Sequence, residues 1–218
     1  MLFDIDVIWT ALPDLLRGAW LTIIITVFGL VGGSILGVVA GVAQVTKIIP
    51  LKLIAIAYIA LIRGTPLIVQ IMFIYFALPL ILTIRIDPIS AAVCGIAINA
   101  GAYIAELVRG ALLSVNKGLI EAGLALGVTP FRVLVTVTWP IAFRRMLPSL
   151  GNQFIISLKD TAVLIVIGVG ELTRRGQEII SSNFRAVEIW SSVAIMYLIM
   201  TGCLALLLRF VERRMRTV

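Results

Sequence analysis

KGLIEAGLALGVTPFRVLVTVTWPIAFRRMLPSLGN, residues 117–152, lies between two long apolar segments of the chain but cannot itself cross a bilayer. Its longest apolar run, Val133–Ile141, is far shorter than the roughly 20 residues that a spanning helix needs. Basic residues flank this run on both sides, at Arg132, Arg144 and Arg145. Such residues concentrate on the cytoplasmic side of membrane proteins. We therefore expect a cytoplasmic loop at about 114–146 that is apolar enough to need a partner surface.

The composition places the rest of the chain in a membrane. Only 13% of the 218 residues are charged and 61% are hydrophobic, whereas a soluble domain has about 25% charged residues. The N-terminal MLFDIDVIW lacks the basic region of a signal peptide, so we expect the first apolar span to be retained. The net charge of +7 is explained by membrane topology and implies no nucleic-acid partner.

Five apolar segments are long enough to be transmembrane helices. They are residues 19–45, 51–83, 88–113, 147–168 and 189–208. The second segment, which Arg63, Pro66 and Pro79 interrupt, is either one long, bent crossing or two short ones. The sequence therefore predicts an all-α membrane protein with a single domain over residues 1–218.

The distribution of charge decides between one crossing and two. Residues 44–52, residues 109–146 and the tail RFVERRMRTV are basic, whereas the N-terminus carries Asp4, Asp6 and Asp14. One crossing by the second segment puts all three basic stretches on the cytoplasmic side. We therefore expect five spans, with the N-terminus outside and the C-terminus in the cytoplasm.

The residue types exclude most site chemistry. The chain has no histidine, and its two cysteines lie in apolar stretches, so neither a metal centre nor a histidine-based triad is expected. No lysine follows a glycine, so the phosphate-binding motif of ATPases is absent. We expect no enzyme activity and no cofactor bound by this chain.

Two local patterns predict close packing and a short helix. Glycines recur every fourth residue in the first span, at Gly29, Gly33, Gly37 and Gly41, and would let another helix backbone approach that face. In the loop, Gly118–Leu126 is a plausible helix, because Gly127 suits the position after its end and Pro130 follows.

That loop resembles the EAA loop of ABC-importer permeases. The matching positions are Glu121-Ala122-Gly123, Gly127, Val137 and Trp139-Pro140, with Gly123, Val137 and Trp139 departing from the usual residues. The resemblance implies a coupling helix that fits a groove on a cytoplasmic ATPase dimer. Its contact residues would be Glu121, Ala122, Gly123, Leu126 and Gly127. ATP and Mg would be used by that ATPase.

Further blocks resemble the polar amino-acid permeases of bacteria, and among them the glutamine permeases. They are IRGTPLIVQIMFIYFALP (62–79), INAGAYIAELVRGALLSV (98–115) and LPSLGNQFIISLKDTAVL (147–164). The resemblance implies a type I ABC importer with the MetI-like fold, in the bacterial inner membrane. It also implies an extracytoplasmic amino-acid-binding protein and a second permease copy, as a homodimer, for partners.

Lys159 and Asp160 raise a separate question, because ionisable residues at membrane depth are costly and usually have partners. Neighbouring helical positions point in different directions, so the two cannot neutralise each other. Arg63 and Glu106 are the candidate partners on other helices. The alternative to a ligand site is a set of structural ties between helices.

An amino acid is a zwitterion, and the intramembrane polar groups could bind both of its charges. Arg63 could bind the carboxylate and Asp160 the ammonium, while Asn99 and Tyr103 share one helix face. The predicted substrate site comprises Arg63, Thr65, Leu67, Asn99, Tyr103, Asp160 and Thr161.

Outside the membrane, the residues Glu171, Arg174, Arg175 and Glu178 are expected on a solvated helix. The resemblance implies that this helix helps to receive the binding protein.

Two other functions remain open on residues alone. An ion-coupled secondary transporter or channel would use Arg63, Glu106, Lys159 and Asp160 for ion coupling, but the chain lacks a repeated pair of interrupted helices. A membrane-embedded enzyme would need a lysine, aspartate or serine site, for which no motif is visible.

Overall fold

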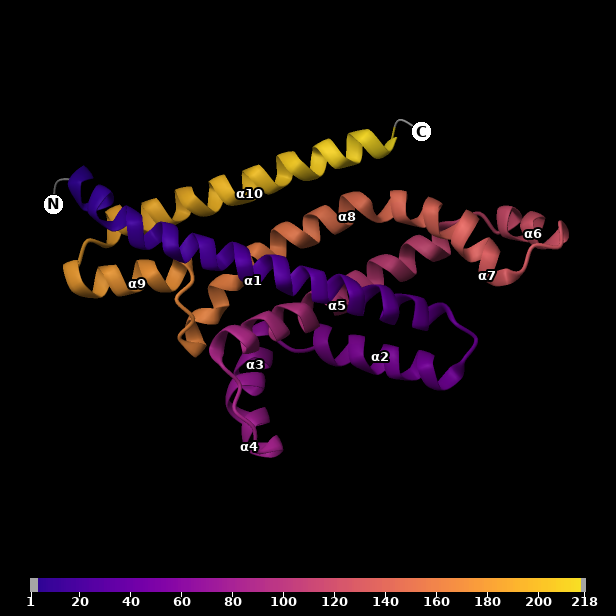
Figure 1. Cartoon of the computed structure of the whole chain (residues 1–218), viewed down its shortest axis with the longest axis horizontal. Helices are drawn as coiled ribbons and strands as arrows, with labels where there is room; N and C mark the ends of the chain where they lie inside the picture. The colour runs from indigo at the N-terminus through magenta and orange to yellow at the C-terminus, as the bar shows by residue number, and fades with distance from the viewer. Residues whose placement is uncertain (1–3, 217–218) are drawn as a thin grey trace.

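The computed structural model describes residues 4–216, and all regular structure within them is helical. The elements are α1 (Ile5–Val45), α2 (Ile49–Arg63), α3 (Leu67–Met72), α4 (Leu78–Leu82), α5 (Pro88–Ser114), α6 (Lys117–Ala125), α7 (Pro130–Val133), α8 (Trp139–Asp160), α9 (Leu172–Asn183) and α10 (Ala186–Arg216). Two π-helical turns, Phe73–Ala77 and Leu134–Thr138, and the 3-10 segment Thr161–Ile167 join some of them. The molecule is elongated, with α9 at one end and α6 at the other (Figure 1).

Among these residues, four helical runs are long and apolar enough to cross a membrane: Ile5–Val45, Pro88–Ser114, Pro130–Ile167 and Ala186–Met215. A fifth span forms if α2 and the run Leu67–Leu82 are taken together. These two segments are bent by 106° at their junction. The second predicted segment is therefore broken, because α2 ends at Arg63 and the next helix begins only after Pro66.

The first helix begins 14 residues before the expected span, at Ile5 instead of residue 19. The side chain of Asp4 caps it by accepting a hydrogen bond from the backbone N–H of Asp6 at 3.0 Å. The added turns are covered: Ala11 and Leu15 pack with Leu172 of α9 in one buried cluster. These turns are therefore held by apolar contacts with the far end of the chain.

The fourth span also begins earlier than expected. Its helical run starts at Pro130, 17 residues before the predicted start at 147. Pro130 occupies the first helical turn, where its missing N–H costs nothing. The run Val133–Ile141 is therefore helical and extends the span, and the connection between spans is limited to α6 and its flanking residues.

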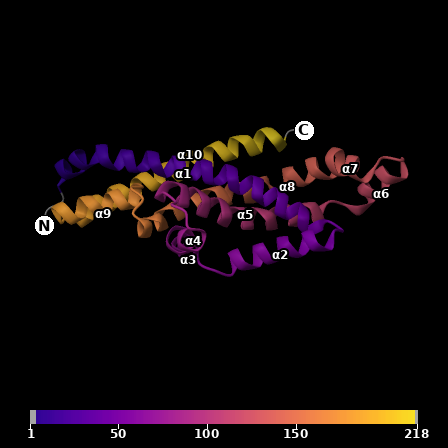
Figure 2. The ribbon, with the colours of Figure 1, turned by 60° about the horizontal axis from the view of Figure 1, so that its bottom comes forward.

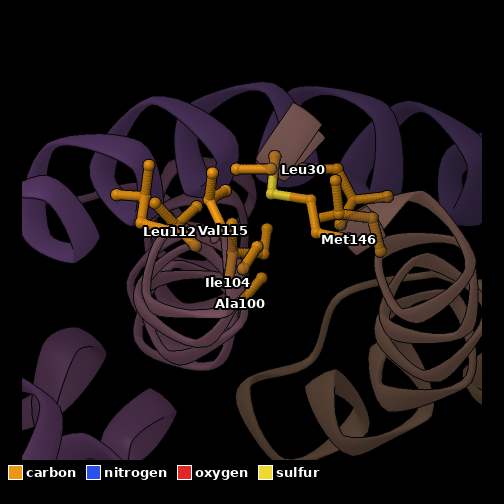
Figure 3. Close-up of a cluster of buried hydrophobic side chains, with 10 residues drawn as sticks. Leu30, Ala100, Ile104, Leu112, Val115 and Met146 are labelled. Carbon is orange, nitrogen blue, oxygen red and sulfur yellow. The ribbon is translucent and has the colours of Figure 1, made fainter. Parts of the chain in front are cut away.

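The glycine ridge of α1 packs on α5, as its spacing predicts. Gly29 faces Ile96, Gly37 faces Ile104 and Gly41 faces Val108. Around this contact lies the largest cluster of buried side chains, which includes Leu30, Ala100, Ile104 and Met146 (Figure 3). The α1–α5 pair is therefore the packed centre on which the other helices rest.

The three basic stretches lie toward one end of the molecule. The α1–α2 connection, α6 and the C-terminal end of α10 are all on the side opposite α9 in both ribbon views (Figures 1 and 2). This arrangement is the one that a single, bent crossing by the second segment requires.

Candidate functional site

The candidate coupling segment is α6, which projects beyond the ends of the long helices (Figure 1). Asn116 caps it by accepting a hydrogen bond from the backbone N–H of Gly118 at 2.9 Å. The helix ends at Ala125, and Gly127 follows with φ +79, a conformation that favours glycine. The predicted short helix is confirmed.

The faces of α6 differ in what they contact. Gly123 lies against Val133, and a Cβ added at Gly123 would be 3.0 Å from the Val133 Cγ2. Glu121 and Ala122 are exposed, and Leu126 is 82% exposed. Nearby Phe131 is 75% exposed. The segment therefore presents large apolar side chains that nothing in the described chain covers.

Arg145 ties the start of the coupling segment to α8. Its guanidinium donates to the backbone carbonyl of Ser114, the last residue of α5, and to the Ser114 hydroxyl at 3.1 Å. Ser114 lies two residues before the Asn116 cap of α6. This contact would therefore transmit a displacement of α6 to α8.

Two neighbouring cavities lie between α5 and α8. The first, of about 460 Å³, is lined by Arg63, Tyr103, Glu106, Leu107, Pro148, Ser149, Asn152 and Gln153. The second, of about 430 Å³, shares Glu106, Leu107 and Ser149 and reaches Ser114 and Arg145. Together they form an open groove, lined by both polar and apolar residues, that extends along the bundle to Ser114, and we call it the α5–α8 groove.

Charged side chains of the α5–α8 groove pair with one another. Glu106 accepts from Arg109 at 3.0 Å and lies 3.5 Å from the Arg63 guanidinium. The Arg63 guanidinium also sits over the Tyr103 ring, 5.4 Å from its centroid. The expectation that Arg63 and Glu106 would serve Lys159 and Asp160 is therefore wrong, because they bind each other.

A second polar network is centred on Gln70, which is not among the predicted site residues. Its amide nitrogen donates to the Thr65 hydroxyl at 2.9 Å and to the Ile62 carbonyl at 2.7 Å. Its amide oxygen accepts from Asn99 at 3.0 Å. Both amides are buried. The position of this amide between Val69 and Ile71, in an otherwise apolar run, could have indicated its role, because polar side chains within membranes form hydrogen bonds between helices.

The remaining predicted site residues lie near the 3-10 segment Thr161–Ile167. Leu67 packs with Leu164 and Ile167 in one apolar cluster. Thr161 is buried and donates its hydroxyl proton to the Leu158 carbonyl at 2.7 Å. Asp160 is partly buried, and neither it nor the exposed Lys159 forms an ion pair within residues 4–216.

The structure therefore divides the seven predicted substrate residues into three groups. Arg63 and Tyr103 lie together in the α5–α8 groove. Thr65 and Asn99 are joined through Gln70. Leu67, Asp160 and Thr161 lie on or against the 3-10 segment, which packs on α3.

At the other end of the molecule, Glu171 is buried, which corrects the expected solvated position. It caps α9 by accepting from the backbone N–H groups of Thr173 at 2.9 Å and Arg174 at 2.7 Å. The Tyr197 hydroxyl donates to it at 2.9 Å. Burial raises the pKa of the Glu171 carboxyl, while the two backbone N–H groups act in the opposite direction. Glutamate is not among the preferred N-cap residues, so the sequence did not predict that Glu171 caps α9.

The other three residues of this segment are exposed or half-buried and form ion pairs. Glu178 contacts Arg174 at 2.9 Å and Arg175 at 3.1 Å. Within the described residues, no group of histidine, cysteine, aspartate and glutamate side chains could hold a metal ion.

Comparison with known proteins gives consistent matches. Residues 33–217 match the family described as binding-protein-dependent transport system inner membrane component. The glutamine transport system permease protein GlnP of Escherichia coli is 56% identical over 217 residues, which cover 99% of each chain.

Two solved structures share the fold. A crystal structure of an amino acid ABC transporter with histidines superposes with a TM-score of 0.90, at 35% identity, covering 98% of this chain and 100% of the other. An inward-facing structure of the MetNI methionine ABC transporter superposes with a TM-score of 0.79, at 24% identity, covering 92% and 95%. The MetI-like architecture expected from the sequence is confirmed.

Proposed function

This chain belongs to the family of inner membrane components of binding-protein-dependent transport systems, and we propose that it is the permease of an ABC importer that carries glutamine. The class of transporter follows from the family and from the full-length identity to a glutamine permease. Glutamine itself is proposed because that 56% identity extends over both whole chains. The ion-coupled transporter considered from the residues alone finds no support in these relatives.

The observation that supports coupling to an ATPase is the exposure of apolar side chains on α6 and at its C-terminal end. Leu119 and Leu126, seven residues apart, lie on one helix face, and they are 48% and 82% exposed. A protruding helix of nine residues is marginal alone and gains stability by docking. We propose that a cytoplasmic ATPase binds the coupling segment, with Glu121, Ala122, Gly123, Leu126 and Gly127 as its contact residues. That ATPase would bind ATP and Mg and perform hydrolysis, and this chain would not act as an enzyme.

The proposed cycle is a shift between two states of the bundle. ATP binding closes the ATPase dimer and moves α6, and the Arg145–Ser114 contact carries this movement to α8. Because α8 forms one wall of the α5–α8 groove, the groove changes shape with it. Hydrolysis returns the bundle to its inward state.

The proposed substrate path uses both polar regions. At one point of the path Asp160, free of ion pairs within the described chain, would bind the substrate ammonium beside Thr161 and Leu67. At a separate point the Arg63 guanidinium, over Tyr103 in the α5–α8 groove, would bind the carboxylate, and Thr65 and Asn99, joined through Gln70, would supply further polar contacts. Five helices enclose only a thin path, so we propose that a second copy of the chain completes it.

The proposed orientation follows from charge. The basic α1–α2 connection, α6 and the end of α10 would face the cytoplasm. The N-terminus and α9 would face the outside, where an amino-acid-binding protein docks near Arg174, Arg175 and Glu178.

The deciding experiment reconstitutes the chain in liposomes with its ATPase and binding protein and measures ATP hydrolysis. Glutamine-loaded binding protein should stimulate hydrolysis above the rate with the unloaded protein. Stimulation by another loaded amino acid but not by glutamine would correct the substrate and leave the importer class in place. Absence of a stable association with the ATPase would refute the coupling role of α6.

A further inference from the structure

An apolar cavity of about 240 Å³ lies beneath α6, between the coupling helix and the bundle. Its lining comes from the ends of α1 and α5, from α6 and from the start of the fourth span: Val45, Leu112, Leu113, Ile120, Leu124, Pro130, Val133, Leu134 and Thr138. We infer that this cavity binds one acyl chain of an anionic phospholipid, whose headgroup is held by the lysines at its rim. This lipid site is separate from the proposed substrate path and from the proposed ATPase contact.

Water is a poor occupant for this cavity. Thr138 supplies the only hydroxyl among nine lining side chains, whereas a buried water typically needs two to four polar partners. An apolar cavity of about 150 Å³ is already large enough to bind benzene. The space beneath α6 is larger, and its chemistry suits a hydrocarbon.

The chain itself does not close the cavity. Leu113 is 63% exposed and Leu124 is 42% exposed, although both line it. No residue of α6 is buried within the described structure. The cavity is therefore open to an occupant that this chain does not supply.

The ATPase would meet a different face of α6. Ile120 and Leu124, four residues apart, point into the cavity. Ala122 and Leu126 are each two positions further along, about 200° around the helix axis, on the opposite side. A lipid under α6 and an ATPase outside it can therefore bind at the same time.

The charges at this end suit an anionic headgroup. Lys47 follows Val45 by two residues, Lys117 lies in the first turn of α6 and Arg132 precedes Val133. All three are exposed, and none forms an ion pair within residues 4–216. A phosphodiester close to them would gain charge-assisted hydrogen bonds.

The test measures lipid binding to the purified full-length permease by native mass spectrometry. Phosphatidylglycerol is titrated against phosphatidylcholine with the same acyl chains. One phosphatidylglycerol per chain should bind at least about tenfold more tightly than phosphatidylcholine, which is about 1.4 kcal/mol. Val45→Phe, which fills the cavity, should remove this tight binding. Val39→Phe, on the exposed surface of the same helix, should retain it.

The headgroup is tested with a second pair of variants. Lys47→Gln combined with Lys117→Gln should weaken phosphatidylglycerol binding to the level of phosphatidylcholine. Arg85→Gln, in the connection between α4 and α5, should leave it unchanged. Tight binding that survives Val45→Phe, or equal binding of the two lipids by the original chain, would overturn the proposal. Size-exclusion profiles identify any variant that has not folded, and Leu113→Trp then replaces Val45→Phe as the variant that obstructs the cavity.

Discussion

Gly37 of α1 lies directly against Ile104 of α5: a Cβ added at Gly37 would be 2.6 Å from both the Cβ and the Cγ2 of Ile104. No real Cβ contact is this short, so Gly37→Ala must push the two helices apart. We expect it to lower the free energy of unfolding by about 1–3 kcal/mol, the usual cost of overpacking. Thermal unfolding in detergent measures the effect.

Gly202→Ala is the matched control, because a Cβ at Gly202 in α10 meets nothing within 4 Å. There, alanine should be neutral or stabilising by up to about 1 kcal/mol through its helix propensity. Equal unfolding temperatures for the two variants would contradict the packing role of the ridge.

The second prediction concerns pH and the buried Glu171 cap. Because burial raises the pKa of this carboxyl in the folded protein, its contribution to stability is fully present below the unfolded pKa of about 4.3. It is lost as the pH rises through the folded pKa. Glu171→Gln keeps an acceptor for the α9 N–H groups and cannot ionise.

The measurement compares unfolding temperatures of the two proteins at pH 4, 6 and 8. The original chain should lose stability relative to Glu171→Gln as the pH rises, and the difference between them isolates this group from other carboxyls. A difference that stays constant with pH would show that Glu171 does not titrate as its burial requires.

The sequence predicted those features that depend on local pattern. The four-residue spacing of the α1 glycines determines a helix face, and that face packs on α5. The end of α6 followed from the glycine and proline that flank it, and Gly127 has the expected positive φ. Neither inference required knowledge of distant parts of the chain.

Features that depend on tertiary contacts could not be predicted from local sequence patterns. The extension of α1 to Ile5 is stabilised by α9, more than 150 residues away in the sequence. The sequence allows Arg63 to pair with any acidic residue at membrane depth, and only the fold shows that its partner is Glu106. Gln70 stands alone in an apolar run, and only the fold shows that it joins Thr65 to Asn99.

The third prediction tests the substrate role of Asp160. Asp160→Asn should reduce glutamine uptake by reconstituted complexes about tenfold or more, because it removes the proposed partner of the ammonium group. Insertion and unfolding temperature should be nearly unchanged, since the described chain offers Asp160 no ion pair to lose. Asp14→Asn, which alters an exposed pair with Arg17, is the control and should transport normally. Loss of folded protein by Asp160→Asn would favour a structural role.

The fourth prediction concerns docking of the ATPase on α6. Glu121→Lys reverses the only charge among the five proposed contact residues. An ATPase surface that complements the glutamate would then meet a like charge, and like charges across an interface cost several kcal/mol. Co-purification of the ATPase should fall about tenfold or more, and uptake should fall with it. Glu121 is exposed and makes no ion pair within residues 4–216, so the fold should be retained.

Glu178→Lys gives the matched control, because it makes the same reversal on α9 at the opposite end of the molecule. It breaks the pairs with Arg174 and Arg175 and should affect only the response to the binding protein, leaving the ATPase attached. If both variants released the ATPase, the effect of Glu121→Lys would come from general destabilisation. If neither did, the apolar residues Leu119 and Leu126 would have to carry the contact, which Leu126→Ser would then test.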